Sequence, residues 1–173
     1  AAIAWLQDEK PLARLLAASW LFFDPGHSEA AFAALNELAR APPERIRQLA
    51  SWQRRRLQIR SRDVTDFNLQ RWDAAVASLE PTLRPGPTFI LSRGYVVRQD
   101  FEFAAATFLK VPLIHDSEHP ISAESLLLAG QALTKIGLRK EAARLYAEIL
   151  DRYAYAAAST QARNALDQLT TKN

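Results

Sequence analysis

Apolar residues recur every three or four positions through most of this 173-residue chain. Such spacing places them along one face of an α-helix, whereas a half-buried strand requires strict alternation of apolar and polar residues. The longest β-like run is the short segment Tyr95-Val96-Val97. Prolines and glycines interrupt the helical pattern and divide it into about nine segments. We therefore predict an all-α fold with short connections.

Three connections between the predicted helices are the least regular parts of the chain. A polar stretch without periodicity predicts a loop over Arg60–Asn68. Arg84-Pro85-Gly86-Pro87 is predicted to be a tight connection between two helices, and the segment from Val111 to Pro120 to be a longer loop. Around them the periodicity predicts helices over 88–98, 101–110, 122–136 and 139–153, with a last helix ending near residue 169.

Composition excludes several classes of protein. The chain is 49% apolar with a formal net charge of only +3, which excludes a disordered chain. No apolar run approaches the ~18–20 residues that span a bilayer, so we predict no transmembrane segment. The absence of cysteine excludes disulfides, thiolate zinc sites and cysteine nucleophiles. Methionine is absent even from position 1, so we expect a fragment or a processed form of a longer chain and assign no compartment.

Patterns typical of catalytic or metal-binding residues are few. His115 and His119 have the H-x3-H spacing of a metal pair, but their segment is predicted to be a loop and no third ligand is indicated. The sequence contains no nucleophile elbow and no glycine-rich phosphate loop. We therefore expect no enzymatic activity, no metal site and no cofactor.

The positive charge is concentrated in one stretch of the chain. Seven arginines and no acidic residue lie between Arg45 and Arg62, and three of them are the consecutive Arg54, Arg55 and Arg56. Because successive helical residues are about 100° apart, this triplet wraps around its helix. One interpretation is a surface that binds phosphates or anionic lipid heads. The interpretation that we favour is that the arginines of this stretch cover Trp52 and pair with acids such as Glu44 and Asp63.

An internal repeat occurs in the C-terminal half of the chain. Its clearest unit is Ala123–Tyr153, where Gly130 lies in a first helix, Gly137 in the turn and Ala142 in a second helix. Small residues at positions 130 and 142 let antiparallel helices approach closely, and Gly137 supplies the positive φ that ends the first helix. Corresponding residues occur one step upstream, with Ala104 placed 38 positions before Ala142.

This pattern resembles the tetratricopeptide repeat (TPR), a two-helix unit of ~34 residues that stacks into a superhelix. The resemblance is clearest over residues 85–153 and covers two repeats and a partial third. The first helix of the partial repeat does not match the family pattern, because Arg62 and Asp63 occupy positions where the pattern has an apolar and a small residue. It implies one right-handed α-solenoid domain over residues 1–173, with HEAT-like or irregular helical hairpins over 1–66 and TPR-like repeats over 67–173. A single irregular helical bundle is the alternative fold.

The resemblance also implies a function. In such a solenoid the first helix of each pair lines a concave face, which receives a helix or an extended peptide. We therefore expect a non-enzymatic scaffold that binds another protein. The residues that the family pattern places on this face are Phe89, Arg93, Val96, Val97, Glu124, Leu127, Gln131, Thr134 and Lys135. They lack the Lys/Asn pairing with which TPR clamps hold chaperone C-termini, so we do not expect that ligand.

Two alternatives remain for the function. A structural segment of a larger assembly would expose an apolar end surface. A module for nucleic acid or an anionic surface would use the basic stretch Arg45–Arg62 and would lose affinity steeply with salt. Nucleic acid is the less favoured partner, and the oligomeric state stays open.

Overall fold

The computed structural model describes residues 2–114 and 120–171. This part of the chain contains ten α-helices, one 3-10 helix and no strand, which confirms the all-α prediction for it. None of the described helices has both the length and the apolar character needed to cross a membrane. The chain divides into two compact units, Ala1–Asp63 and Val64–Asn173.

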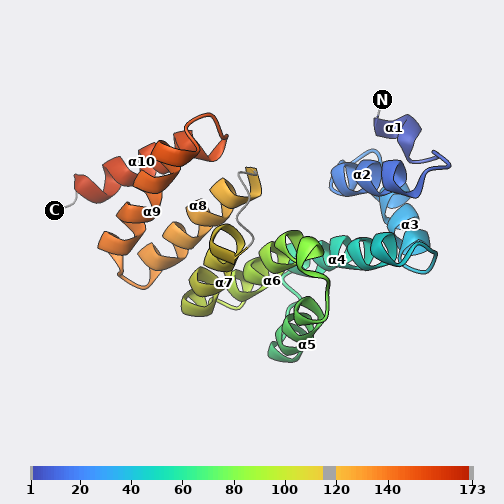
Figure 1. The fold of residues 1–173 in the computed structure, drawn as a ribbon, viewed down its shortest axis with the longest axis horizontal. Coiled ribbons are helices and arrows are strands. Elements are labelled where there is room, and N and C mark those ends of the chain that lie inside the picture. The colour runs from blue at the N-terminus through green and yellow to red at the C-terminus, as the bar shows by residue number, and fades with distance from the viewer. Residues whose placement is uncertain (1, 115–119, 172–173) are drawn as a thin grey trace. The chain divides into compact units, whose positions relative to one another are not determined.

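The first unit is built from four helices (Figure 1). They are α1 (Ala2–Trp5), α2 (Pro11–Leu21), α3 (Ser28–Leu38) and α4 (Glu44–Ser61). α2 packs against both α3 and α4, and the short α1, which the periodicity did not predict, packs on α2. Leucine and alanine side chains such as Leu35 and Ala50 fill the core, and Phe22 joins it just after α2.

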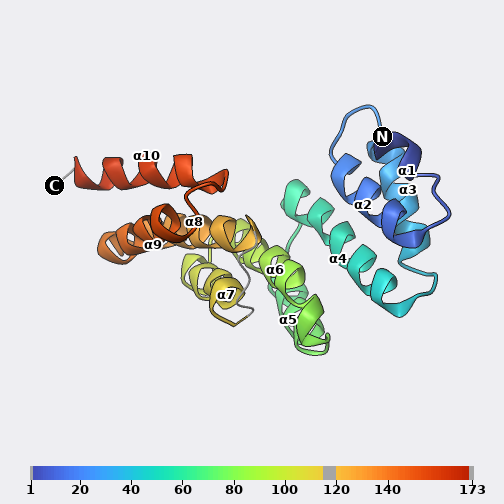
Figure 2. The same cartoon turned by 45° about the horizontal axis from the view of Figure 1, so that its top comes forward.

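The second unit is a series of helices. They are α5 (Asp66–Ala77), the 3-10 helix η1 (Pro81–Leu83), α6 (Pro85–Val97), α7 (Phe101–Ile114), α8 (Pro120–Lys135), α9 (Arg139–Arg152) and α10 (Ala158–Thr170). α5 and η1 both pack on α6, and each helix from α6 to α9 packs on the next one in the chain. α8 also contacts α6 and α10. Figures 1 and 2 show α8, α9 and α10 side by side.

The loop predicted over Arg60–Asn68 is wrong in its extent. α4 runs further than expected and ends where Arg62 takes the left-handed conformation, with φ of 57°. α5 begins directly after Thr65, whose Oγ1 accepts from the Asn68 N–H while Asn68 Oδ1 accepts from the Thr65 N–H. This reciprocal capping satisfies two free amides and starts the helix. Arg62 and Asp63 therefore mark a helix end, and not the interior of a first helix.

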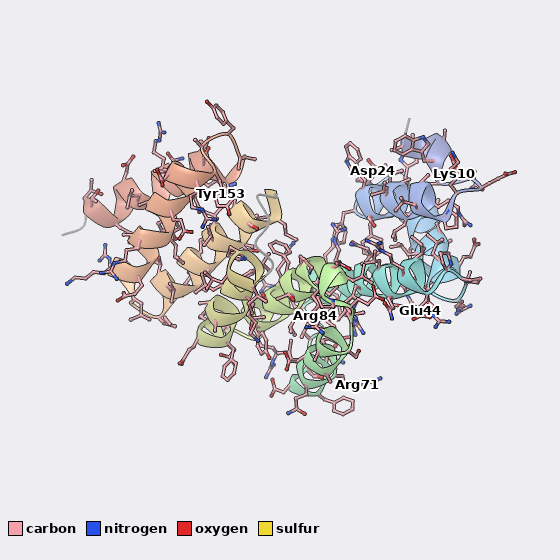
Figure 3. All side chains as sticks on the ribbon, in the orientation of Figure 1. Lys10, Asp24, Glu44, Arg71, Arg84 and Tyr153 are labelled. Carbon is pink, nitrogen blue, oxygen red and sulfur yellow. The ribbon has the colours of Figure 1, made fainter. Side chains whose placement is uncertain are left out.

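Arg84-Pro85-Gly86-Pro87 is a helix start and not the connection that was predicted. Pro85, Gly86 and Pro87 form the first turn of α6, where a missing proline N–H costs no intrahelical bond. Arg84, labelled in Figure 3, donates from Nε to the Leu79 carbonyl at 2.8 Å and from Nη2 to the Ala77 carbonyl at 2.9 Å. The guanidinium thereby satisfies carbonyls at the end of α5 and fixes the link to α6.

Residues 111–114, which were predicted to belong to a loop, are helical. α7 continues to Ile114 and contains Pro112 in its last turn. Proline cannot donate a backbone hydrogen bond there, but Val111 and Pro112 are both buried. Their apolar packing outweighs the lost bond, so the helix extends through a residue that usually ends one.

The turn between α6 and α7 has the same backbone geometry as the turn between α8 and α9, which lies 38 residues later in the chain. Gln99 and Gly137 are the left-handed residues of the two turns, with φ of 60° and 82°. The following N–H donates to a carbonyl five residues earlier in both cases, as in the Schellman motif. These bonds join Asp100 N to Tyr95 O and Leu138 N to Leu133 O, each at 3.0 Å. The positive φ predicted at Gly137 is confirmed, and Gln99 adopts the same conformation without glycine.

Buried positions recur at the same interval of 38 residues. Four buried residues of α6 and α7 each precede a buried residue of α8 or α9 by 38 positions: Leu91 and Ala129, Ser92 and Gly130, Ala104 and Ala142, Phe108 and Tyr146. The predicted close approach at Gly130 is made by an aromatic ring, because a Cβ at this position would lie 2.5 Å from Tyr146 Cε1. Only glycine leaves room there for that ring.

Candidate partner-binding surface

The nine predicted contact residues lie on α6 and α8, two helices that pack against each other. Six of them are exposed: Arg93, Val96, Glu124, Gln131, Thr134 and Lys135. Phe89 and Val97 are half-buried. Eight of the nine side chains therefore have surface that a partner can touch.

Leu127 is the exception, and its prediction as a contact residue is corrected. Its side chain is only 3% exposed and belongs to the same core as Ala158 and Ala162 of α10. α10 packs on α8 and covers the Leu127 side chain. Leu128, one residue further, is half-buried and lies on the helical line of Glu124 and Gln131, four and three residues away. We refer to Leu128 and the eight accessible residues as the α6/α8 surface.

Phe89 and Leu128 give the α6/α8 surface an apolar floor. Both pack against a core cluster to which α7 contributes Phe108. The Phe89 and Phe108 rings meet edge to face, with centroids 5.6 Å apart and planes at 66°, which is a favourable geometry for an aromatic pair. Phe108 is fully buried, so it holds Phe89 in place while part of the Phe89 ring stays accessible.

The polar side chains of the α6/α8 surface differ in whether they are free to contact a ligand. Thr134 Oγ1 donates to the Gly130 carbonyl at 2.8 Å and lies 3.5 Å from Tyr146 Oη, so its hydroxyl is already engaged. Burial raises the pKa of Tyr146, and the contact with Thr134 opposes this shift, so the phenol is neutral near pH 7. Arg93 and Lys135 are exposed, and these two cations are the charged groups best placed to meet a ligand.

Several arginines of α4 contact other residues of the first unit. Arg55 lies over the Trp52 ring at 3.8 Å, and Arg60 lies over the Phe23 ring at 4.9 Å. Arg47 pairs with Glu44. The interpretation that arginines cover Trp52 and pair with Glu44 is confirmed, whereas among the described residues no ion pair with Asp63 is seen.

Arg56 makes the most extensive of these contacts. Its guanidinium lies over the rings of Phe23, at 4.8 Å, and Phe22, at 5.9 Å. Its Nη1 also donates to the Ser19 carbonyl in the last turn of α2 at 2.9 Å, where a cation is favoured by the helix dipole. Arg54 is half-buried, and its buried Nε has no hydrogen-bond partner. Two of the three residues proposed as a basic surface, Arg55 and Arg56, are thus used in packing.

Arg56→Ala is expected to lower the free energy of unfolding by about 2 kcal/mol, because it removes a charged hydrogen bond and two cation–π contacts. Arg45→Ala, in the first turn of the same helix, is the control and should change stability by less than about 0.5 kcal/mol. Urea unfolding followed by circular dichroism measures both. Equal effects for the two variants would show that Arg56 does not hold α4 against α2.

Metal ligation finds no support in the described residues, where no group of three or more His, Asp or Glu side chains is placed to hold an ion. His115 and His119, the predicted candidate pair, lie outside these residues. Comparisons with protein-family models, with curated proteins and with solved structures found no match for this chain.

Proposed function

We propose that the second unit is a right-handed, TPR-like solenoid segment and that the protein is a non-enzymatic scaffold, which binds a peptide or a partner helix on the α6/α8 surface. The observation that carries the proposal is the interval of 38 residues, which relates both the left-handed turns and the buried positions of α6–α7 and α8–α9. Repeated helix pairs that stack in this way present their first helices on one face.

The surface residues obey the same interval, which supports a shared role. Arg93 precedes Gln131 by 38 positions, and Val96 precedes Thr134 by 38 positions, and all four are exposed. α6 and α8 also contact each other. Two equivalent helices with equivalent exposed positions form a continuous strip along which a ligand can lie.

The chemistry of this strip defines the ligand. Phe89, Leu128 and Val96 supply apolar contacts, and Arg93 and Lys135 supply positive charge near them. We therefore propose a segment with one or two apolar side chains followed or preceded by an acidic residue. An amphipathic helix or an extended strand both present that combination.

The double variant Phe89→Ala with Arg93→Glu is expected to weaken binding of such a segment at least about 30-fold, because interface energy is concentrated in a few anchors worth ~2 kcal/mol or more. The probe is a peptide selected from a displayed random library against the full chain, and its affinity is measured by isothermal titration calorimetry. Far-UV circular dichroism checks that the helical content is unchanged.

A matched control removes an aromatic and reverses a positive charge on α7. Phe103→Ala with Lys110→Glu changes two exposed residues of that helix and is expected to leave the affinity within about twofold. The proposal is wrong if the α7 variant weakens binding as much as the α6 variant. It is also wrong if binding depends instead on Arg54, tested as Arg54→Glu, and falls steeply with salt.

A further inference from the structure

α2 is apolar on two opposite sides. Its inner side buries Leu15, Ala17 and Ala18, while its outer side carries Leu12, Leu16 and Trp20, which are 57%, 55% and 80% exposed. The spacing of four residues places these three on one line along the helix. We name the outer line the α2 stripe, and an exposed apolar line of this kind is a candidate contact surface.

Between its two ends, α2 carries no unpaired charged side chain among the described residues. Arg14 is the one charged residue within α2, and its Nη2 is held by Glu37 of α3 at 2.5 Å. α1, which packs on α2, adds the exposed Ile3 and Trp5 to the apolar surface of this unit. Several exposed large apolar side chains on neighbouring helices are a feature of protein–protein interfaces.

Opposite charges flank the two ends of the α2 stripe. Figure 3 labels Lys10 and Asp24, which lie at the beginning and just past the end of α2. At the beginning, Asp8 and Glu9 outweigh Lys10, and Glu9 is exposed. This end therefore carries a net negative charge.

Two arginines supply positive charge at the other end of the stripe. Arg60 is exposed and lies over Phe23, three residues after Trp20, and Arg56 reaches the Ser19 carbonyl beside Trp20. Of the acids near this end, Asp24 is bonded to His27 at 2.6 Å, which lowers the pKa of its carboxyl group, and Glu29 is exposed in the first turn of α3.

We propose that a second copy of this chain covers the α2 stripe, with the two α2 helices antiparallel across a two-fold axis. A two-fold interface brings the same patch of both copies together, and the two helices run in opposite directions when the axis is perpendicular to them. Leu16 then lies near the axis, Trp20 of one copy faces Leu12 of the other, and the acidic end at Glu9 meets the basic end at Arg60. The charge pattern is complementary to itself only in this antiparallel arrangement, and the inference is independent of the α6/α8 surface.

The oligomeric state of the full chain tests the interface directly. Sedimentation velocity over a range of concentrations should show a monomer–dimer equilibrium, and Trp20→Glu should weaken the dimer at least tenfold. Phe67→Glu is the matched control, because Phe67 is also an exposed aromatic, on α5, and it should leave the equilibrium unchanged. A chain that stays monomeric at all concentrations overturns the proposal. If that monomer binds phosphatidylserine vesicles and Trp20→Glu abolishes this binding, the α2 stripe contacts an anionic membrane and not a second copy.

Charge exchange distinguishes a second copy from any other occupant. Glu9→Arg alone and Arg60→Glu alone should each weaken their own dimers, because like charges then meet at both ends. An equimolar mixture of the two variants should restore dimers, because every pair in the mixed dimer is again of opposite sign. Failure of the mixture to recover the dimer overturns the antiparallel arrangement.

A single cysteine tests the position of the axis. The chain has no cysteine of its own, so Leu16→Cys introduces the sole thiol. Mild oxidation should link this variant into disulfide-bonded dimers, whereas Tyr155→Cys, at an exposed position of the second unit, should remain unlinked. Equal linking of both variants would show random collision and would contradict the proposed axis.

Discussion

Tyr146→Ala is expected to lower the free energy of unfolding by about 3–5 kcal/mol, the usual cost of truncating a buried aromatic side chain. Tyr146 is one of the largest fully buried side chains, and its ring fills the space that Gly130 leaves between α8 and α9. The lost contacts with Ala142 and Ile149, in the same core, leave a cavity that helices held by short turns cannot close. Urea unfolding followed by circular dichroism measures the change.

Tyr155→Ala is the matched control for this prediction. The Tyr155 side chain is fully exposed in the segment between α9 and α10, so the same truncation there should change stability by less than about 0.5 kcal/mol. Similar losses for the two tyrosines would contradict the role of Tyr146 as the residue that joins the α8–α9 pair.

Phe108→Ala is expected to cost a similar ~3–5 kcal/mol and also to weaken the candidate site. Phe108 is fully buried on α7 and supports Phe89 at a centroid distance of 5.6 Å. Without it the Phe89 ring can turn into the cavity, so affinity for the library-selected peptide should fall together with stability. Chemical unfolding and calorimetric titration measure the two effects.

Phe108→Leu separates these effects. Leucine refills most of the volume, so this variant should recover most of the stability and part of the affinity. If Phe108→Ala lost stability but bound the peptide with unchanged affinity, Phe108 would not be the support of the binding surface.

Sequence periodicity predicted the helical class because the buried face of each helix repeats within the helix itself. It failed where a tertiary or capping contact decides the boundary. α7 continues through Pro112 because Val111 and Pro112 are buried, and Thr65 starts α5 through its exchange of hydrogen bonds with Asn68. The Thr-x-x-Asn spacing is visible in the sequence, but asparagine is a less usual partner than glutamate in this motif.

The candidate surface could be predicted only in part, for a related reason. A repeat pattern identifies which side of a helix faces its own partner, but the packing of α10 against α8 covers Leu127 and leaves Leu128 half-buried. That contact joins helices more than twenty residues apart and has no local signal. The same holds for Arg56, whose contact with Ser19 spans 37 positions.

Amide NMR of the full chain during titration with the library-selected peptide tests the central proposal most directly. The largest shift changes are expected at Phe89, Arg93 and Val96 of α6 and at Leu128, Gln131 and Lys135 of α8. Changes centred on α4, along Arg54–Arg56, or on the α2 stripe would contradict the proposal that the α6/α8 surface binds the partner.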